Sequence, residues 1–259
     1  MAQFAPQYNL FVIIDKIRQW ILWIFCFIFI LSIVPEILKL LSVKLNFEDL
    51  ISTLNIICII CFFVLETIVE NILVPQADSK RRDDFIDNSF GSSFSSNPSI
   101  GYFDTAELEQ GLFKAASNLF ENCFFTYSLV KAVTIRKTLL PTVVLLSITV
   151  FAYYGFKEVP FGLTLLQALF SATVLGNLIN HFILMVRLHS IQDAWITLFQ
   201  NQDIRSNTEK YKTLIFRYWL QYETLHSRIQ AGIPDKIFKK FNSGLTKEWE
   251  EIKTRYNIK

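Results

Sequence analysis

Four windows of nearly unbroken apolar residues divide the chain, and shorter polar stretches lie between them. The windows cover approximately residues 20–41, 50–73, 139–156 and 161–186. A bilayer core needs about 20 helical residues, and a backbone in lipid must satisfy its own hydrogen bonds. The pattern therefore predicts an all-α integral membrane protein with four transmembrane helices, paired as two hairpins, and a helical cytoplasmic domain.

The second window allows another interpretation, because its charge-free part is only about 16 residues long. Apolar runs of about 10–14 residues are typical of buried core helices, and runs of 18 or more are typical of spans. Glu66 and Glu70 follow one turn beyond that part, where they could reach the interface. We interpret the window as a span that ends at Pro75, with a core helix as the alternative.

Lysine and arginine are distributed unevenly around the windows. The first link between windows holds Lys39 and Lys44, and the last holds only Lys157. The other 22 basic residues lie in the N-terminal flank, the central segment and the tail. Because basic residues favour the cytoplasmic side, we predict a multi-pass inner-membrane protein with both termini inside.

This topology gives the predicted domain organisation. It comprises a cytoplasmic flank 1–19, hairpin 20–74, a helical cytoplasmic insert 75–138 with a Ser/Gly-rich loop 89–101, hairpin 139–186, and a helical cytoplasmic tail 187–259. In the insert, Asp104-Thr105-Ala106-Glu107 resembles a capping box, which predicts a helix from there into the third span. In the tail, 232–235 predicts a helix break and 242–245 a further turn.

Composition supports a membrane protein and excludes some functions. Apolar residues make up 52% of the chain and charged residues 19%, below the roughly 25% of globular proteins. The net charge of +2 is too small to predict nucleic-acid binding. Cys58 and Cys61 form a C-x-x-C pair, but no second ligand pair accompanies it, so we interpret them as small apolar residues.

The fourth window carries small and polar residues at helical spacing. The candidates are Gln167, Ala168, Ser171, Ala172, Gly176, Asn177, Asn180 and His181. Small residues let two helices approach closely, and polar groups in a bilayer need a hydrogen-bonding partner or water. The residues predict either a packing seam with interhelical hydrogen bonds or the lining of a water-filled lumen.

Charged residues flank the first hairpin. The acids are Glu36, Glu66 and Glu70, and the basic cluster is Lys80, Arg81 and Arg82. Glu66 and Glu70 could pair with the basic cluster, or form an acidic ring in an oligomer that attracts cations. The cluster itself predicts contacts with anionic lipid headgroups, or else an anionic or nucleotide ligand site.

Signals for catalysis are weak. None of the histidines, His181, His189 and His226, lies in a zinc-protease or catalytic-triad pattern, and no phosphate-binding glycine loop is present. The sequence therefore predicts no enzyme, no catalytic residue, no cofactor and no metal site.

Several local strings resemble bacterial membrane proteins: Lys80–Gly91, Gly101–Asp104, Asn118–Phe125 and Lys247–Lys253. Those proteins are similar to the four-transmembrane pore-forming effectors encoded beside nucleotide-second-messenger synthases. The resemblance implies a role in anti-phage defence, in which the protein damages the inner membrane when a signal arrives. It implies no catalytic residue.

Two main hypotheses follow. The first is a membrane effector that senses a cytoplasmic protein or nucleotide signal and perturbs the membrane as a homo-oligomeric pore in contact with lipid. The second is a membrane-anchored scaffold, whose spans only localise the cytoplasmic domain. A small channel or transporter is a further alternative, although the span cores carry no charge.

Overall fold

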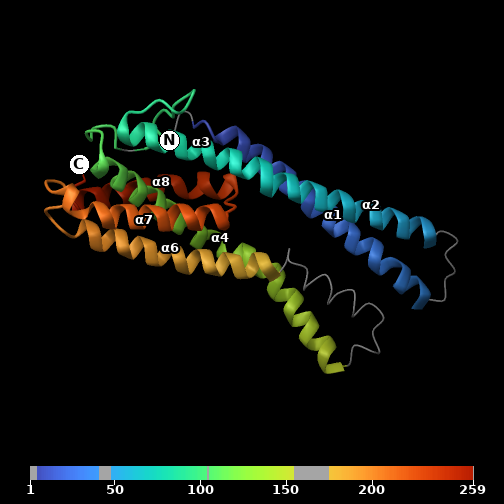
Figure 1. The fold of residues 1–259 in the computed structure, drawn as a ribbon. Coiled ribbons are helices and arrows are strands. Elements are labelled where there is room, and N and C mark those ends of the chain that lie inside the picture. The colour runs from blue at the N-terminus through green and yellow to red at the C-terminus, as the bar shows by residue number, and fades with distance from the viewer. Residues whose placement is uncertain (1–4, 41–47, 104, 155–174, 259) are drawn as a thin grey trace. The chain divides into compact units, whose positions relative to one another are not determined.

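The computed structural model describes residues 5–40, 48–103, 105–154 and 175–258 (Figure 1). Within these ranges the regular elements are helices, and no strand is present. They are α1 (Tyr8–Leu40), α2 (Glu48–Ile68), the π-helix η1 (Val69–Leu73), α3 (Val74–Phe90), α4 (Leu112–Tyr154), α6 (Asn177–Phe199), α7 (Thr208–Arg228) and α8 (Asp235–Arg255). The predicted all-α class is confirmed for this part of the chain.

Among the described residues, two helical stretches are long and apolar enough to cross a membrane. They are Tyr8–Pro35 and Asp49–Phe90, and only 6% of the most apolar window of each is buried by protein. A core helix of a soluble protein would be mostly covered, whereas these apolar side chains are not. The third predicted span lies in the second half of α4, and most of the fourth lies outside the described residues.

The chain divides into two compact units. The core unit takes residues 1–11, 75–134 and 180–259, and the apolar unit takes residues 12–74 and 135–179. Most of α3 belongs to the core unit, although its backbone continues directly from α2 and η1. Likewise, α4 begins in the core unit and ends in the apolar unit.

In the apolar unit, α1 forms an antiparallel hairpin with α2 and η1, and three pairs of side chains among the described residues join them. The pairs are Arg18–Glu70, Phe25–Phe62 and Ser32–Asn55. The ions lie 2.7 Å apart, the ring centroids 6.1 Å apart, and the amide donates to the hydroxyl at 3.0 Å. Their spacing of seven or eight residues on each helix is close to two helical turns, so one continuous seam joins the helices.

The helix that contains α2 does not end at Pro75, so that prediction is wrong. Proline lacks an N–H and its ring crowds the carbonyl four residues earlier. Here the preceding turn widens into η1, in which Val74 N–H donates to the Val69 carbonyl. The wider turn accommodates the ring, and α3 continues until Gly91, whose φ of +72° favours glycine.

Asp104 of the predicted capping box lies outside the described residues, and residues 105–107 do not begin a helix, because α4 begins at Leu112. The Thr105 hydroxyl donates instead to the Asn118 side-chain oxygen, which lies inside the core unit. Asn118 in turn donates to Asn88 at 2.9 Å and to Ser89 at 3.1 Å, at the end of α3. The loop before α4 is therefore fixed by a buried amide, and α4 continues through Pro141 as predicted.

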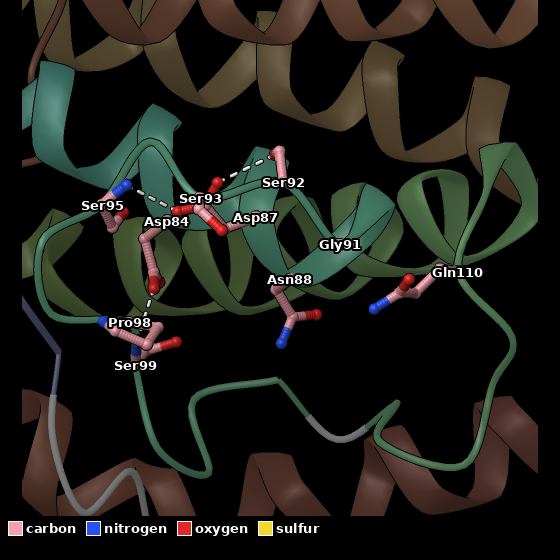
Figure 2. Close-up of a pocket in the computed structure, with 10 residues that line it drawn as sticks. All are labelled: Asp84, Asp87, Asn88, Gly91, Ser92, Ser93, Ser95, Pro98, Ser99 and Gln110. Atoms are coloured by element: carbon pink, nitrogen blue, oxygen red, sulfur yellow. Dashed lines mark hydrogen bonds between the residues drawn. The ribbon is translucent and has the colours of Figure 1, made fainter.

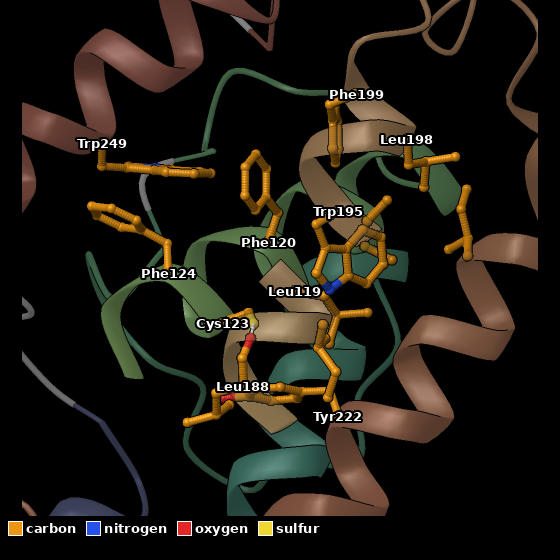
Figure 3. Packing of buried hydrophobic residues seen from close by; sticks show 14 of the residues in the cluster. Leu119, Phe120, Cys123, Phe124, Leu188, Trp195, Leu198, Phe199, Tyr222 and Trp249 are labelled. Atoms are coloured by element: carbon orange, nitrogen blue, oxygen red, sulfur yellow. Dashed lines mark hydrogen bonds between the residues drawn. The ribbon is translucent and has the colours of Figure 1, made fainter. Parts of the chain in front are cut away.

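Aromatic rings from α4, α6 and α8 form the centre of the core unit (Figure 3). Phe120 lies 5.2 Å from Phe199 and 5.3 Å from Trp249 between ring centroids, and Trp195 is also fully buried. The tail has a break at 200–207 that the sequence did not predict, together with the predicted break at 232–235. The further turn predicted at 242–245 is wrong, because those residues lie inside α8.

Candidate functional site

A buried charge cluster joins α3 to α7 in the core unit. Arg81 of α3 is 7% exposed and donates two hydrogen bonds to Glu223 of α7, at 3.2 Å and 2.6 Å. This bidentate geometry is the strong form of an arginine–carboxylate pair. Burial alone would lower the pKa of Arg81, but the neighbouring Glu223 raises it above the ordinary value. The guanidinium therefore stays charged inside the protein.

Asp78 and His226 complete the cluster. Asp78 is 2% exposed, and its Oδ1 lies 3.7 Å from Arg81 Nε and 3.4 Å from His226 Nδ1. Burial would raise the pKa of Asp78, but the contact with His226 and the nearby arginine charges lower it below 3.8. Two acids, one arginine and one histidine thus share the α3–α7 charge cluster, which holds its charges in compensating pairs.

The cluster is connected to α4 as well. The Tyr222 hydroxyl lies 3.2 Å from the Thr126 hydroxyl, and burial raises the pKa of Tyr222. Neighbouring positions of α7 therefore reach two of the helices that have residues in both units, α3 and α4. These groups are packed against one another, so their role is to hold the helices in position.

A polar pocket of about 350 Å³ lies where α3 meets the following loop (Figure 2). Its lining comprises Asp84, Asp87, Asn88, Gly91, Ser92, Ser93, Ser95, Pro98, Ser99 and Gln110. The Asp87 carboxylate accepts from the Ser92 hydroxyl at 2.8 Å and from the backbone N–H groups of Phe94 and Ser95 at 2.8 and 2.6 Å. Asp84 accepts from the Ser99 N–H at 2.6 Å. The two acids therefore fold the loop back onto α3.

The two carboxylates of this pocket have pKa values displaced in opposite directions. Burial raises the pKa of Asp84, and the charge of Asp87 adds to this effect beyond what Ser99 offsets. Burial acts on Asp87 too, but the loop N–H groups outweigh it and lower its pKa below 3.8. Of these two carboxylates, Asp87 is consequently the one that holds the loop in its ionised form.

Acid is expected to remove the stabilisation that Asp87 provides. Its folded-state pKa lies below the ordinary 3.8, so the contribution is complete above 3.8 and is lost as pH falls through the lower folded value. The difference in unfolding free energy between wild type and Asp87→Asn should be constant near neutral pH and shrink below 3.8. Urea unfolding followed by tryptophan fluorescence measures it, with Asp83→Asn on the same helix as control. A difference that does not change with pH would contradict the assignment.

The structure separates the three residues of the predicted basic cluster. Lys80 is exposed and Arg82 is partly exposed, but Arg81 lies in the ion pair with Glu223 and does not face headgroups or an outside ligand. The assignment of Arg81 to a surface site is therefore corrected. The physical reason is that a helix residue at this position points toward α7, where a carboxylate is available.

The predicted pairing of the membrane-edge acids also changes. Glu70 pairs with Arg18 of α1 and not with the basic cluster. Glu66 is partly buried one turn earlier on α2. The side chain of Glu36 lies outside the described residues. The acidic ring that Glu66 and Glu70 could form in an oligomer stays a prediction.

The candidates of the fourth window are only partly described. Gln167, Ala168, Ser171 and Ala172 lie outside the described residues, while Gly176 precedes α6 and both Asn177 and Asn180 are exposed on it. His181 is 3% exposed, and its Nε2 lies 3.0 Å from the Thr134 hydroxyl of α4. His181 thus makes an interhelical contact, whereas the two asparagines do not lie in the protein interior.

Sequence reasoning missed Asp78, Asn118 and Glu223 as structural polar residues. Glu223 is 142 residues from Arg81, and no local pattern distinguishes it from a solvated acid on an amphipathic helix. Asp78 gave a weak signal, because it precedes Arg81 by three residues and so shares its helix face.

Comparison with known proteins adds no relative: no family model, curated protein or solved structure matches the chain. Among the described residues, no three His, Cys, Asp or Glu side chains are grouped so as to hold a metal ion. For the part of the chain that the structure describes, the fold and site therefore define a class: an all-helical protein with two helices able to cross a membrane and a core unit with an aromatic centre and a buried charge cluster.

Proposed function

We propose that the chain is a membrane effector: a four-span inner-membrane protein that makes the bilayer permeable as a homo-oligomer when its cytoplasmic core unit binds a signal or partner. One observation carries this proposal. The helix from α2 through η1 to α3 is continuous, with apolar exposed side chains in its first part and the α3–α7 charge cluster in its last part.

A continuous helix transmits displacement, because its backbone hydrogen bonds resist bending over short distances. The α3–α7 charge cluster fixes the cytoplasmic end of this helix through Arg81 and Glu223. The π-helix η1 lies between the two parts, and such turns occur often at functional sites. A ligand that repositions α7 would therefore move α3 and, through it, α2.

The resemblance described above supplies the biological setting, namely signal-dependent membrane damage in anti-phage defence. Four helices enclose too little space for a wide pore, so a pore requires several copies. The exposed Asn177 and Asn180 at the start of α6 are polar groups that could face water in such an assembly.

A scaffold is the second candidate, favoured by a partly exposed apolar surface on α7. Phe216 and Leu220 are 39% and 66% exposed, and Trp219 stacks between Phe216 and Phe90. Exposed apolar side chains in a group are typical of a protein-binding surface. In this alternative, an unrelated membrane anchor could replace the spans without loss of function.

Inducible expression in a bacterial host, with and without phage challenge, tests the proposal. We expect loss of membrane potential, read with a voltage-sensitive dye, and arrest of growth. Asn177→Leu with Asn180→Leu should reduce the loss of potential if these side chains face water, without unfolding the core unit, because both residues are exposed. Normal potential and growth in both conditions would exclude an effector and favour the scaffold.

A further inference from the structure

The apolar stripe of α8 extends beyond the core that it packs against. Leu245 and Trp249 are buried, with exposed fractions of 7% and 0%. Phe241 and Phe238 continue this stripe toward the start of the helix at spacings of three and four residues, yet they are 38% and 41% exposed. The first two turns of α8 therefore present two phenylalanines that the protein covers only in part.

Three exposed lysines accompany these phenylalanines. They are Lys236, Lys239 and Lys240. Lys239 Nζ lies 2.6 Å from Asp235, and Lys240 Nζ lies 5.5 Å from the centre of the Phe241 ring. On a helix with 3.6 residues per turn, Lys239 and Lys240 fall on the two sides of the polar face, and Lys236 lies opposite the phenylalanine stripe. Phenylalanines on one face with lysines on the polar face are typical of a helix that lies in the interface of an anionic bilayer.

The position of this segment in the core unit agrees with such a partner. The start of α8 follows the end of α7 after a connector of six residues, 229–234. Near that end of α7, His226 contacts Asp78, which lies one turn after α3 begins. The start of α8 therefore lies near the end of the core unit at which α3 begins.

We propose that the first two turns of α8, residues 235–241, form a docking surface for the anionic headgroups of the bilayer that the chain itself spans. The lysine ammonium groups pair with lipid phosphates, and the two phenylalanine rings enter the interfacial layer. The inference rests on the membrane location in the proposed function but not on pore formation. Charge complementarity selects an anionic lipid, because the three lysines outnumber the one acid, Asp235.

Limited trypsin digestion of the full chain in nanodiscs tests this surface. One set of discs contains phosphatidylcholine alone, and the other contains phosphatidylglycerol as well. Lysines near an anionic surface bind it more tightly than a neutral one, so cleavage after Lys236, Lys239 and Lys240 should be at least about tenfold slower in the anionic discs. Cleavage after Lys247, exposed on the same helix, should be unchanged and serves as the internal control.

Two variants separate lipid docking from a general change in helix stability. Phe238→Ser with Phe241→Ser should lose most of the protection, whereas Phe238→Leu with Phe241→Leu should retain it. Equal cleavage rates in both lipids for the wild-type chain would overturn the proposal, whichever variants fold. Co-elution of chain and disc verifies membrane insertion. Protection without loss of membrane potential in cells would refute the effector proposal alone.

Discussion

Replacing Glu223 with alanine is expected to destabilise the core unit by about 3–5 kcal/mol. The change removes both hydrogen bonds to Arg81 and leaves a guanidinium that is 7% exposed. Asp78 remains nearby, but its oxygen lies 3.7 Å from Arg81 Nε and also lies close to His226. A single contact to Nε, shared with His226, cannot replace the two hydrogen bonds of Glu223, so the buried charge is poorly compensated. Urea unfolding of the detergent-solubilised chain, followed by tryptophan fluorescence, measures the loss.

The same helix provides a matched control for this prediction. Glu209 pairs with Lys212 at 3.2 Å, but both side chains are exposed, at 78% and 53%. Glu209→Ala should therefore change the unfolding free energy by about 0.5 kcal/mol or less. Arg81→Met combined with Glu223→Leu should recover much of the loss, because apolar groups can replace a buried pair. Equal effects of Glu223→Ala and Glu209→Ala would contradict a buried, structural ion pair.

Replacing Trp249 with alanine should cost a similar amount, about 3–5 kcal/mol, because it leaves a cavity at the centre of the core unit. Trp249 has no exposed surface, and its ring lies 5.3 Å from Phe120 and 6.0 Å from Phe124, both on α4 (Figure 3). These rings hold α8 against α4. The surrounding helices can close such a space only in part.

Two variants test whether this loss comes from packing. Trp249→Phe keeps an aromatic ring and should cost less than Trp249→Ala. Leu220→Ala on α7, where the side chain is 66% exposed, should change stability by about 0.5 kcal/mol or less. The unfolding free energy of each variant is measured in the same denaturant series. A loss for Trp249→Ala no larger than that for Leu220→Ala would show that the ring contacts do not support the core unit.

Both predictions concern the unit that would receive a signal in the proposed function. Weakening the Arg81–Glu223 pair frees α3 from α7, while removing Trp249 loosens α8 from α4. In the proposed effector, the first variant should change the dose of inducer at which the membrane potential is lost, because α3 continues from α2. Measuring stability and permeability on the same variants would show whether the packing of the core unit controls the loss of membrane potential.

The sequence by itself determined the helical class and the apolar stretches. Both are local properties, because about 20 consecutive apolar residues predict a helix in lipid wherever the rest of the chain lies. It also located the helix break at 232–235, where glycine and proline act on their own backbone. Some local signals still failed: Pro75 does not end its helix, since the widened turn at Val69–Leu73 accommodates it.

Only the tertiary structure decided which partners the polar side chains of the core unit contact. Thr105 looked like a helix cap but donates to Asn118, and Arg81 looked like a headgroup contact but pairs with Glu223. Sequence spacing cannot identify such partners, because the energy of a buried ion pair depends on distance and burial between segments far apart in the chain. Folding brought α7 beside α3, and that packing converted one arginine of an ordinary basic cluster into the centre of a buried site.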